Sequence, residues 1–355
     1  MAENTKIEWA HHTFNPWIGC TKVSPACMHC YAERDFDHRL GQVQWGPNGT
    51  RVLTSNENWA KPLKWNRDVQ REYEVAQAQW VADCCVGTKS YPEPKLNQFR
   101  KRVFCASLSD VFEDWQGPML NSKCERGVVT CADSVWFTNG PVSNCRDLTM
   151  DDVRTQLFAL IDATPNLDWL LLTKRPENIR KMYLSQHLDG GTTGRIRELM
   201  DEGESKDVHP YFRRNVWLGT SVENQEYADK RIPELLKCRD LSPVLFLSCE
   251  PLLGNLEIEP FLSLDATECC PGCDEIGCNC GAIDWVIAGG ESGPEARPSK
   301  PDWFRSLRNQ CQTAGVPFLF KQWGEFGEHL EQRVGKVRAG RSLDGVIHDG
   351  FPVRS

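Results

Sequence analysis

Short apolar runs recur along this chain of 355 residues, and each of them ends in polar residues. The apolar residues within a run do not alternate with polar ones, which is typical of strands buried on both faces of a parallel sheet. The pattern therefore predicts a series of buried strands. The runs lie at residues 13–20, 102–110, 168–178, 215–225, 244–254, 284–294 and 317–325.

Segments of helical character separate several of these runs. Residues 149–165 begin with a Thr and acidic residues and stop before a proline, and residues 299–317 stop at an Ala-Gly pair. Residues 224–238 contain Pro233, which we expect to break the helix or to begin its second part.

Helices and strands in alternation predict an α/β fold with mainly parallel strands, arranged as a complete or partial (β/α) TIM-like barrel. An open doubly wound sheet is the alternative, although no G-x-G-x-x-G motif follows the first strand. Two segments interrupt the alternation, at 111–148 and 264–282, and both contain several cysteines. We interpret them as a loop insertion and a Cys-rich insertion within a single barrel domain that spans residues 1–355.

The composition is that of a soluble globular protein, with 40% hydrophobic and 25% charged residues. No run of 18 apolar residues occurs, and the polar start of the chain lacks the apolar core of a secretory signal. We therefore expect a cytoplasmic protein without a membrane partner, whose 17 cysteines are thiols or metal ligands rather than disulfides. The net charge of −8 gives no global attraction for nucleic acid, although a local basic groove is compatible with it.

Polar and charged residues directly follow nearly every predicted strand. Barrels of this kind carry their chemistry at the C-terminal ends of the strands. The exit of a strand to solvent explains one or two polar ends, whereas so many favour a shared ring of functional groups. The strand ends offer Cys20, Ser107, Ser109, Asp110, Thr173, Lys174, Arg175, Ser221, Glu223, Asn224, Ser248, Glu250, Gly289, Gly290, Glu291, Ser292, Lys321, Gln322 and Trp323 for this ring.

Two pairs in this ring also have a simpler interpretation. Gly289 and Gly290 would let a ligand approach the backbone closely, or they would form only a turn. Lys174 and Arg175 would bind a carboxylate or phosphate, or they would form a solvated pair at the start of a helix.

Three cysteines, Cys20, Cys27 and Cys30, share the segment GCTKVSPACMHCYAE with the spacing C-x6-C-x2-C. Structural zinc sites take four ligands, and His29 is poorly placed to act as the fourth. Three thiolates on one loop suit a four-iron cluster with one open iron, which can bind a substrate or cofactor. Three free thiols on a flexible loop would be an oxidation liability. The segment therefore predicts a reactive iron–sulfur centre after the first strand.

A second cysteine group, with the pattern C-C-x2-C-x4-C-x-C, consists of Cys269, Cys270, Cys273, Cys278 and Cys280. It indicates a second metal site, either a structural zinc knuckle or an auxiliary iron–sulfur centre, and the sequence leaves both open. Further ligands would come from the other insertion, unless its cysteines are unrelated to the site; these are Cys124, Cys131 and Cys145. We expect the remaining cysteines to be buried thiols: Cys84, Cys85, Cys105, Cys238, Cys249 and Cys311.

Several blocks of the sequence resemble an uncharacterised family of phage proteins, found in phages, prophages and bacteria and known for a three-Cys motif. The blocks include IEWAHHTFNPWIGCTKVSPACMHCYAER, LLLTKRPENI, VWLGTSVENQEYADKRIPELL, FLSCEPLLG, DWVIAGGESGPEARP and PFLFKQWGE. That family is similar in turn to the radical S-adenosylmethionine (SAM) superfamily. Most of that superfamily uses C-x3-C-x2-C with an aromatic residue before the last cysteine, whereas here the first spacing is six and His29 occupies the aromatic position.

The resemblance implies a radical SAM-type enzyme. A four-iron, four-sulfur (4Fe-4S) cluster would be held by Cys20, Cys27 and Cys30 and would chelate SAM. An electron-donor protein would reduce it, SAM would be cleaved reductively, and hydrogen would be abstracted from an unknown substrate. A nucleic-acid base or nucleotide is the first candidate for that substrate, because of the phage association.

Strand position and side-chain chemistry then assign roles around SAM. The methionine end would meet Ser107, Ser109 and Asp110. The SAM carboxylate would pair with Arg175 or Lys174, and Glu223 would bind the ribose hydroxyls. The residues left for the substrate are Glu250, Glu291, Lys321 and Gln322. The alternative from another class is a non-catalytic, zinc-binding interaction protein of phage origin.

Overall fold

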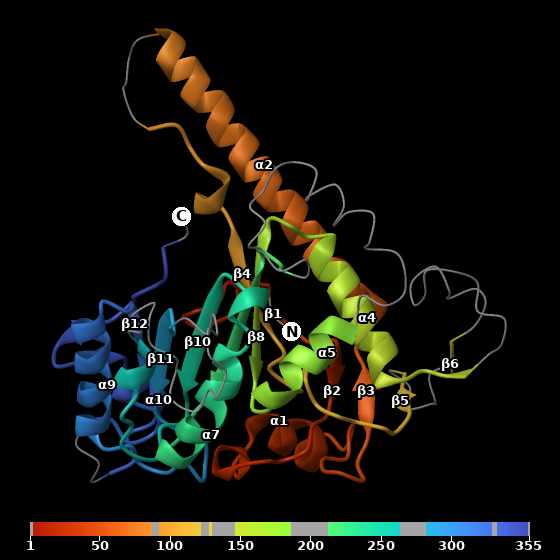
Figure 1. The fold of residues 1–355 in the computed structure, drawn as a ribbon, viewed down its shortest axis with the longest axis vertical. Coiled ribbons are helices and arrows are strands. Elements are labelled where there is room, and N and C mark those ends of the chain that lie inside the picture. Colours follow the sequence, from red (N-terminus) through yellow and green to blue (C-terminus); the bar gives the residue numbers. More distant parts are fainter. Residues whose placement is uncertain are drawn as a thin grey trace, which may run out of the picture.

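A curled sheet of seven parallel strands forms the centre of the molecule and makes a half-barrel (Figure 1). The computed structural model describes residues 3–86, 92–121, 128–129, 146–185, 212–262, 282–328 and 332–353. The strands, in the order in which they pair, are β1 (His12–Phe14), β4 (Lys101–Cys105), β8 (Leu167–Thr173), β9 (Val216–Ser221), β10 (Val244–Cys249), β11 (Trp285–Gly289) and β12 (Phe318–Gln322). Each overlaps one predicted run, so the partial barrel is confirmed.

Both faces of the sheet are buried, which is why the strands show no alternation in sequence. Trp169 and Leu171 of β8 belong to the core between the sheet and the helices, whereas Leu170 between them belongs to a second core on the concave face. The first and last described segments of the chain complete that second core. Trp9 packs on Phe104 of β4, and Phe351 packs on Trp285 of β11.

Helices cover the outer face of the sheet (Figure 1). The longer ones are α2 (Asn56–Val86), α4 (Met150–Asp162), α5 (Ile179–Ser185), α7 (Gln225–Leu236) and α9 (Pro301–Ala314). The short ones are α1 (Tyr31–Glu33), α8 (Glu259–Leu262) and α10 (Lys336–Ala339). The 3-10 segments are Pro25–Cys27, Leu96–Gln98, Pro176–Asn178 and Arg239–Leu241, and a π-helical segment spans Arg34–Arg39.

Three of these helices confirm the predicted ones. The Thr149 hydroxyl caps α4 by accepting from the N–H of Asp152 at 3.3 Å. Gly315, with a φ of 69°, ends α9 in the left-handed conformation. The predicted break at Pro233 is wrong, because α7 continues through it and the N–H of Lys237 still donates to the Pro233 carbonyl at 3.3 Å.

Helix α2 has no counterpart in the predicted elements. It is 31 residues long, and its second half projects away from the half-barrel (Figure 1). Among its described side chains, no residue from 71 to 84 is buried, and Val75 is 65% exposed. The expectation of a buried thiol is therefore wrong for Cys84, which is exposed, and the side chain of Cys85 lies outside the described residues. The expectation is confirmed for Cys105, Cys238, Cys249 and Cys311, which are buried.

Small sheets flank the half-barrel. One combines β2 (Trp17–Ile18), β3 (Arg51–Leu53) and β5 (Met119–Leu120), and the others pair β6 (Val128–Val129) with β7 (Arg146–Asp147) and β13 (Ser342–Leu343) with β14 (Val346–Ile347). The start of the predicted insertion at 111–148 is part of the body, since Val111 and Phe112 are fully buried. The cysteines of both insertions lie outside the described residues: Cys124, Cys131, Cys145, Cys269, Cys270, Cys273, Cys278 and Cys280.

Candidate functional site

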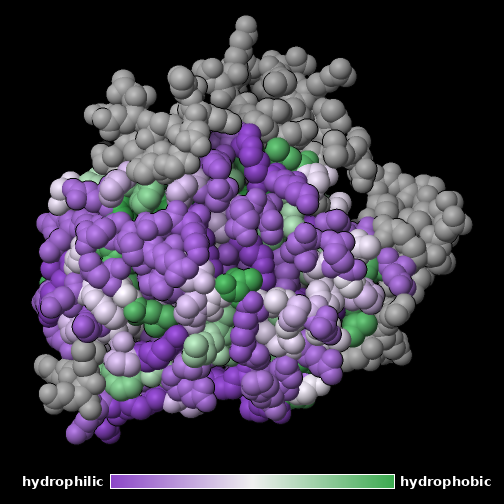
Figure 2. All heavy atoms as spheres, turned by 60° about the horizontal axis from the view of Figure 1, so that its bottom comes forward, coloured by the Kyte–Doolittle hydropathy of each residue, from purple (hydrophilic) through white to green (hydrophobic). Residues whose placement is uncertain are grey.

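A cavity of about 640 Å³ lies at the C-terminal ends of the seven strands. Each strand of the half-barrel, or the segment that directly follows it, contributes to the cavity wall, through Thr13, Ser107, Lys174, Ser221, Ser248, Gly290 and Lys321. Most of the predicted ring residues therefore do lie around one space. The face of the molecule that comes forward in Figure 2 is largely hydrophilic, with hydrophobic residues only in small patches among the coloured atoms.

The three cysteines line this cavity from the loop between β2 and α1, and all three are half-buried. Backbone bonds fix the start of the loop, since the N–H of Gly19 donates to the Leu108 carbonyl at 3.1 Å. Gly19 has a φ of 115°, and a Cβ at this position would lie 2.4 Å from the Thr50 carbonyl oxygen. At the other end of the loop, the Tyr31 hydroxyl donates to the Ser107 carbonyl at 2.6 Å. The loop is thus attached directly to the segment that follows β4.

Arg175 ties the same loop to the end of β8. Its Nη2 donates to the Thr21 carbonyl at 2.8 Å, and its Nη1 lies 3.8 Å from the sulfur of Cys20. Nη1 also donates to Oδ2 of Asp110 at 2.9 Å. The guanidinium is buried and has partners on several sides, so it holds the loop rather than presenting a free cation.

Asp110 is occupied in the same way. It accepts from the Thr173 hydroxyl at 2.7 Å and from the N–H of Lys174 at 3.0 Å, in addition to Arg175. A second buried pair extends the network, since Glu113 receives bonds of 2.8 and 2.7 Å from Arg51 and lies 3.5 Å from Arg175. Arg51 and Glu113 were not predicted as site residues.

Glu223 also holds the cysteine loop in place. It is fully buried, its Oε2 lies 2.9 Å from Nη1 of Arg231, and its Oε1 accepts from the N–H of Ala26 at 3.3 Å. Glu223 is not part of the cavity wall. The structure therefore gives it a positioning role, and the expected contact with a ribose stays a prediction.

Glu291 forms a further attachment of the loop. Its oxygens receive bonds of 2.7 and 2.6 Å from Arg297, which also donates to the Pro25 carbonyl at 3.1 Å. His29 lies 3.5 Å from the same carboxylate. Burial opposes ionisation, but the hydrogen bonds from Arg297 hold the pKa of Glu291 below its ordinary value. Glu291 thus connects the loop to the end of β11, and its bonding capacity is largely used.

Glu250 and Lys321 form an ion pair of 3.1 Å in the cavity wall, and their side chains are 13% and 19% exposed. The neighbouring glycines make room for protein atoms. A Cβ at Gly289 would lie 2.4 Å from Oε1 of Glu250, and one at Gly290 would lie 1.9 Å from the Trp323 carbonyl oxygen. Both glycines thus lie in close contact with protein atoms, and Gly290 also lines the cavity, so approach of a ligand to this pair stays a prediction.

The remaining predicted residues have neutral partners. Lys174 donates to the Ser221 hydroxyl at 3.3 Å, and Ser107 accepts from the side chain of Asn15 at 3.0 Å. The amide of Gln322 donates to the Gly290 carbonyl at 3.2 Å. Ser109 also lines the cavity, and its buried hydroxyl has no hydrogen-bond partner among the described residues.

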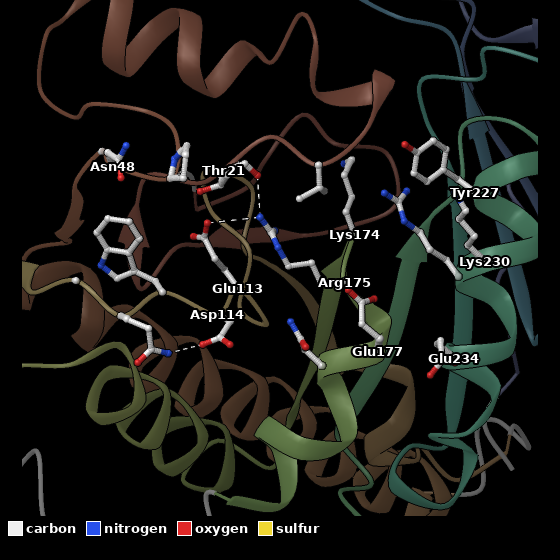
Figure 3. A pocket seen from close by; sticks show the side chains of 18 of the residues that line it. Thr21, Asn48, Glu113, Asp114, Lys174, Arg175, Glu177, Tyr227, Lys230 and Glu234 are labelled. Carbon is white, nitrogen blue, oxygen red and sulfur yellow. Dashed lines mark hydrogen bonds and ion pairs between the residues drawn. The ribbon is translucent and has the colours of Figure 1, made fainter.

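An open groove of about 1060 Å³ adjoins the cavity. In Figure 3, Glu113 and Asp114 lie on one side of it, Tyr227 of α7 lies on the other, and Lys174 and Arg175 lie between them. The cavity and the groove share four residues, Thr21, Val23, Lys174 and Arg175. A ligand in the groove would therefore be next to the cysteine loop.

The donor set of the loop fits an iron–sulfur cluster in the number and type of its ligands. Three cysteines share one cavity wall, and the protein surroundings of Cys20 and Cys30 favour their neutral thiols. Burial, reinforced by the carboxylates of Glu113 and Asp110, raises the pKa of Cys20 to about 12, and burial also raises the pKa of Cys30. Bound cations would displace these protons. The three sulfurs are not positioned around a common point. Within the described residues, no group of at least three His, Cys, Asp or Glu side chains is arranged to hold a metal ion.

Fold and site together define an α/β half-barrel protein with a three-cysteine loop at the C-terminal edge of its sheet. The chain belongs to the family described as a protein of unknown function, DUF5131, whose model matches residues 4–119 and 115–352. Comparisons with curated proteins and with solved structures gave no match. Within the described part of the chain, no helix combines the length and apolar character needed to cross a membrane.

Proposed function

We propose that this protein is a phage-type radical SAM enzyme, in which Cys20, Cys27 and Cys30 hold a 4Fe-4S cluster. The observation that carries the proposal is the position of the three-cysteine loop, which faces the polar strand ends across one cavity. The resemblance of the sequence blocks to a family similar to the radical SAM superfamily supports it. When bound, the cluster would supply the electron that cleaves SAM reductively, so that hydrogen is abstracted from a substrate.

Lys174 is the best candidate to bind the carboxylate of SAM. Arg175, the alternative, spends its donors on Asp110, Thr21 and Glu113. The only hydrogen bond of the Lys174 ammonium described here goes to a neutral hydroxyl, so it can still pair with an anion. Ser107 and Ser109 line the same cavity and would contact the methionine end.

The chain's own residues would position the cofactor and shield it. Arg175, Glu223 and Arg297 attach the loop to the ends of three different strands or their following loops. A loop fixed at several points keeps the open side of the site in one place and limits access of water. An electron-donor protein is required, and the substrate would enter from the groove. A nucleic-acid base or nucleotide is the substrate we propose first.

Anaerobic reconstitution tests the proposal. The full chain is purified without oxygen, supplied with iron and sulfide, reduced, and examined by optical and electron paramagnetic resonance (EPR) spectroscopy with and without SAM. We expect an iron–sulfur signal that changes when SAM is added, because SAM would bind the open iron. A colourless protein that contains only zinc would contradict the proposal and favour a zinc-binding interaction protein.

The Cys27→Ala variant should lose the signal. Cys84→Ala is the matched control, because Cys84 is an exposed thiol on α2 and does not line the cavity. Loss of the signal in Cys27→Ala but not in Cys84→Ala assigns the cluster to the loop. An equal signal in both variants would show that the ligands lie elsewhere.

A further inference from the structure

Glu250 and Lys321 differ from the anchored charged residues around the cavity because they keep unused bonding capacity. Asp110, Arg175 and Glu291 spend theirs on one another, on the backbone and on Arg297. In contrast, among the described residues the pair has one polar contact, of 3.1 Å between Nζ of Lys321 and Oε1 of Glu250. An ammonium has three donors and a carboxylate about four acceptor positions, so both groups can serve a ligand at the same time.

The pair is held in place by the sheet beneath it. Glu250 follows β10 and Lys321 belongs to β12, so the two side chains meet over the end of β11. This meeting requires Gly289, because a Cβ there would lie 2.4 Å from the Glu250 carboxylate. Both side chains are shielded but still partly exposed, at 13% and 19%. Partial desolvation strengthens their hydrogen bonds to a ligand that reaches them.

The charges of the pair restrict the ligand. An anionic ligand would be attracted by Lys321 and repelled by Glu250, and a cationic ligand would meet the reverse. A neutral group that carries an N–H donor beside a carbonyl acceptor satisfies both. Such a donor–acceptor edge occurs in primary amides and in lactams, including the Watson–Crick edges of several nucleobases.

We propose that Glu250 and Lys321 form a subsite for a neutral amide edge, with the Glu250 carboxylate accepting the ligand N–H and the Lys321 ammonium donating to its carbonyl. As a substrate subsite, this rests on the proposed function; as a binding site, it does not require the cluster. The same chemistry has two sources, a nucleobase or a carboxamide, and the experiment separates them.

Binding is measured on the full chain by ligand-observed nuclear magnetic resonance, with two matched pairs of probes. Uracil is compared with 1,3-dimethyluracil, and benzamide with N,N-dimethylbenzamide, because methylation removes the donor and keeps the ring. We expect the unmethylated probe to bind roughly tenfold to a hundredfold more tightly, as is typical when a charged acceptor loses its partner. Preference within the uracil pair alone assigns a nucleobase, and preference within the benzamide pair alone assigns a carboxamide.

Glu250→Met should abolish this preference, whereas Lys321→Met should weaken the binding of methylated and unmethylated probes alike, because both keep the carbonyl that Lys321 would bind. Lys336→Met is the control, because Lys336 lines the same cavity as an exposed lysine and is not part of the pair. Circular dichroism establishes that each variant is folded. The proposal is overturned if methylated and unmethylated probes bind equally, if neither unmethylated probe binds up to its solubility, or if Glu250→Met retains the preference.

The two proposals fail in different ways. If the protein forms a SAM-responsive cluster but binds methylated and unmethylated probes equally, the proposed function stands and the subsite is wrong. If the protein contains only zinc but binds the unmethylated probes more tightly, the subsite stands and the radical function is wrong.

Discussion

Two sets of charged residues surround the cavity, and they have different surroundings. The anchoring set is Asp110, Glu113, Arg175, Glu223 and Glu291, all between 0% and 8% exposed and bonded to other protein groups. The ligand-facing set is Lys174, Glu250 and Lys321, which are more exposed and keep donors or acceptors toward the cavity. The difference shows that charge at a strand end is not sufficient to identify a binding residue. Burial and the number of protein partners separate a group that builds the site from one that serves a ligand.

The largest effect should come from Arg175→Met. It leaves Asp110 buried without its cation, and breaking a buried ion pair typically costs about 3–5 kcal/mol. Arg231→Met should lower the free energy of unfolding by a similar amount, because Glu223 would be left unpaired. Urea denaturation monitored by circular dichroism measures both. If either variant lowers the free energy of unfolding by less than about 1 kcal/mol, that pair contributes no more than a surface ion pair.

Replacing Arg175 or Arg231 by lysine keeps the positive charge and tests whether either residue affects the reduction potential of the proposed cluster. Arg175 lies 3.8 Å from the sulfur of Cys20, whereas Arg231 is bonded to Glu223 and the Ser221 carbonyl. Hydrogen bonds to ligand sulfurs raise the reduction potential of iron–sulfur clusters. Arg175→Lys should therefore lower the potential measured by EPR-monitored redox titration, and Arg231→Lys should leave it unchanged. Equal shifts in both variants would indicate that only the loop position matters.

Substitution of Gly289 or Gly290 by alanine should have an intermediate effect on the free energy of unfolding. At Gly290 an added Cβ meets backbone, at 1.9 Å from the Trp323 carbonyl oxygen, whereas at Gly289 it meets the mobile end of the Glu250 side chain. Overpacking typically costs about 1–3 kcal/mol, so we expect Gly290→Ala at the upper end and Gly289→Ala at the lower. Thermal or urea unfolding measures the order. Gly289→Ala should also abolish the preference for unmethylated probes, and the reverse stability order would contradict the assigned contacts.

The smallest effect on stability should come from Lys321→Met. Its ion pair with Glu250 is partly exposed, and such pairs contribute about 0.2–1 kcal/mol. The same urea experiment should place this variant close to the unsubstituted protein, even though it binds the probes more weakly. A destabilisation as large as that of Arg175→Met would move Lys321 into the anchoring set.

The half-barrel could be predicted from the sequence because its strands are buried on both faces. Uninterrupted runs such as 168–178 and 244–254 can be recognised without knowledge of their neighbours. Helix α2 was missed because it lacks a continuous apolar face. Near its start Trp65 and Val69 are buried, but its second half projects from the body.

The position of the site could also be predicted, because parallel strands bring their C-terminal ends to one edge. The roles within it could not, since they depend on partners that are distant in the sequence. Arg51 and Glu113 are 62 residues apart, and no local pattern connects them. Glu223 is assigned to the loop only when its bond to Ala26 is seen, 197 residues away.

The most direct test of the central claim is the formation of 5′-deoxyadenosine. The reconstituted protein is reduced in the presence of SAM, and the product is quantified by liquid chromatography and mass spectrometry beside Cys27→Ala and Cys84→Ala. Our account predicts product from the unsubstituted protein and from Cys84→Ala, and none from Cys27→Ala. A cluster-loaded protein that yields no 5′-deoxyadenosine, or equal yields from Cys27→Ala, would contradict it.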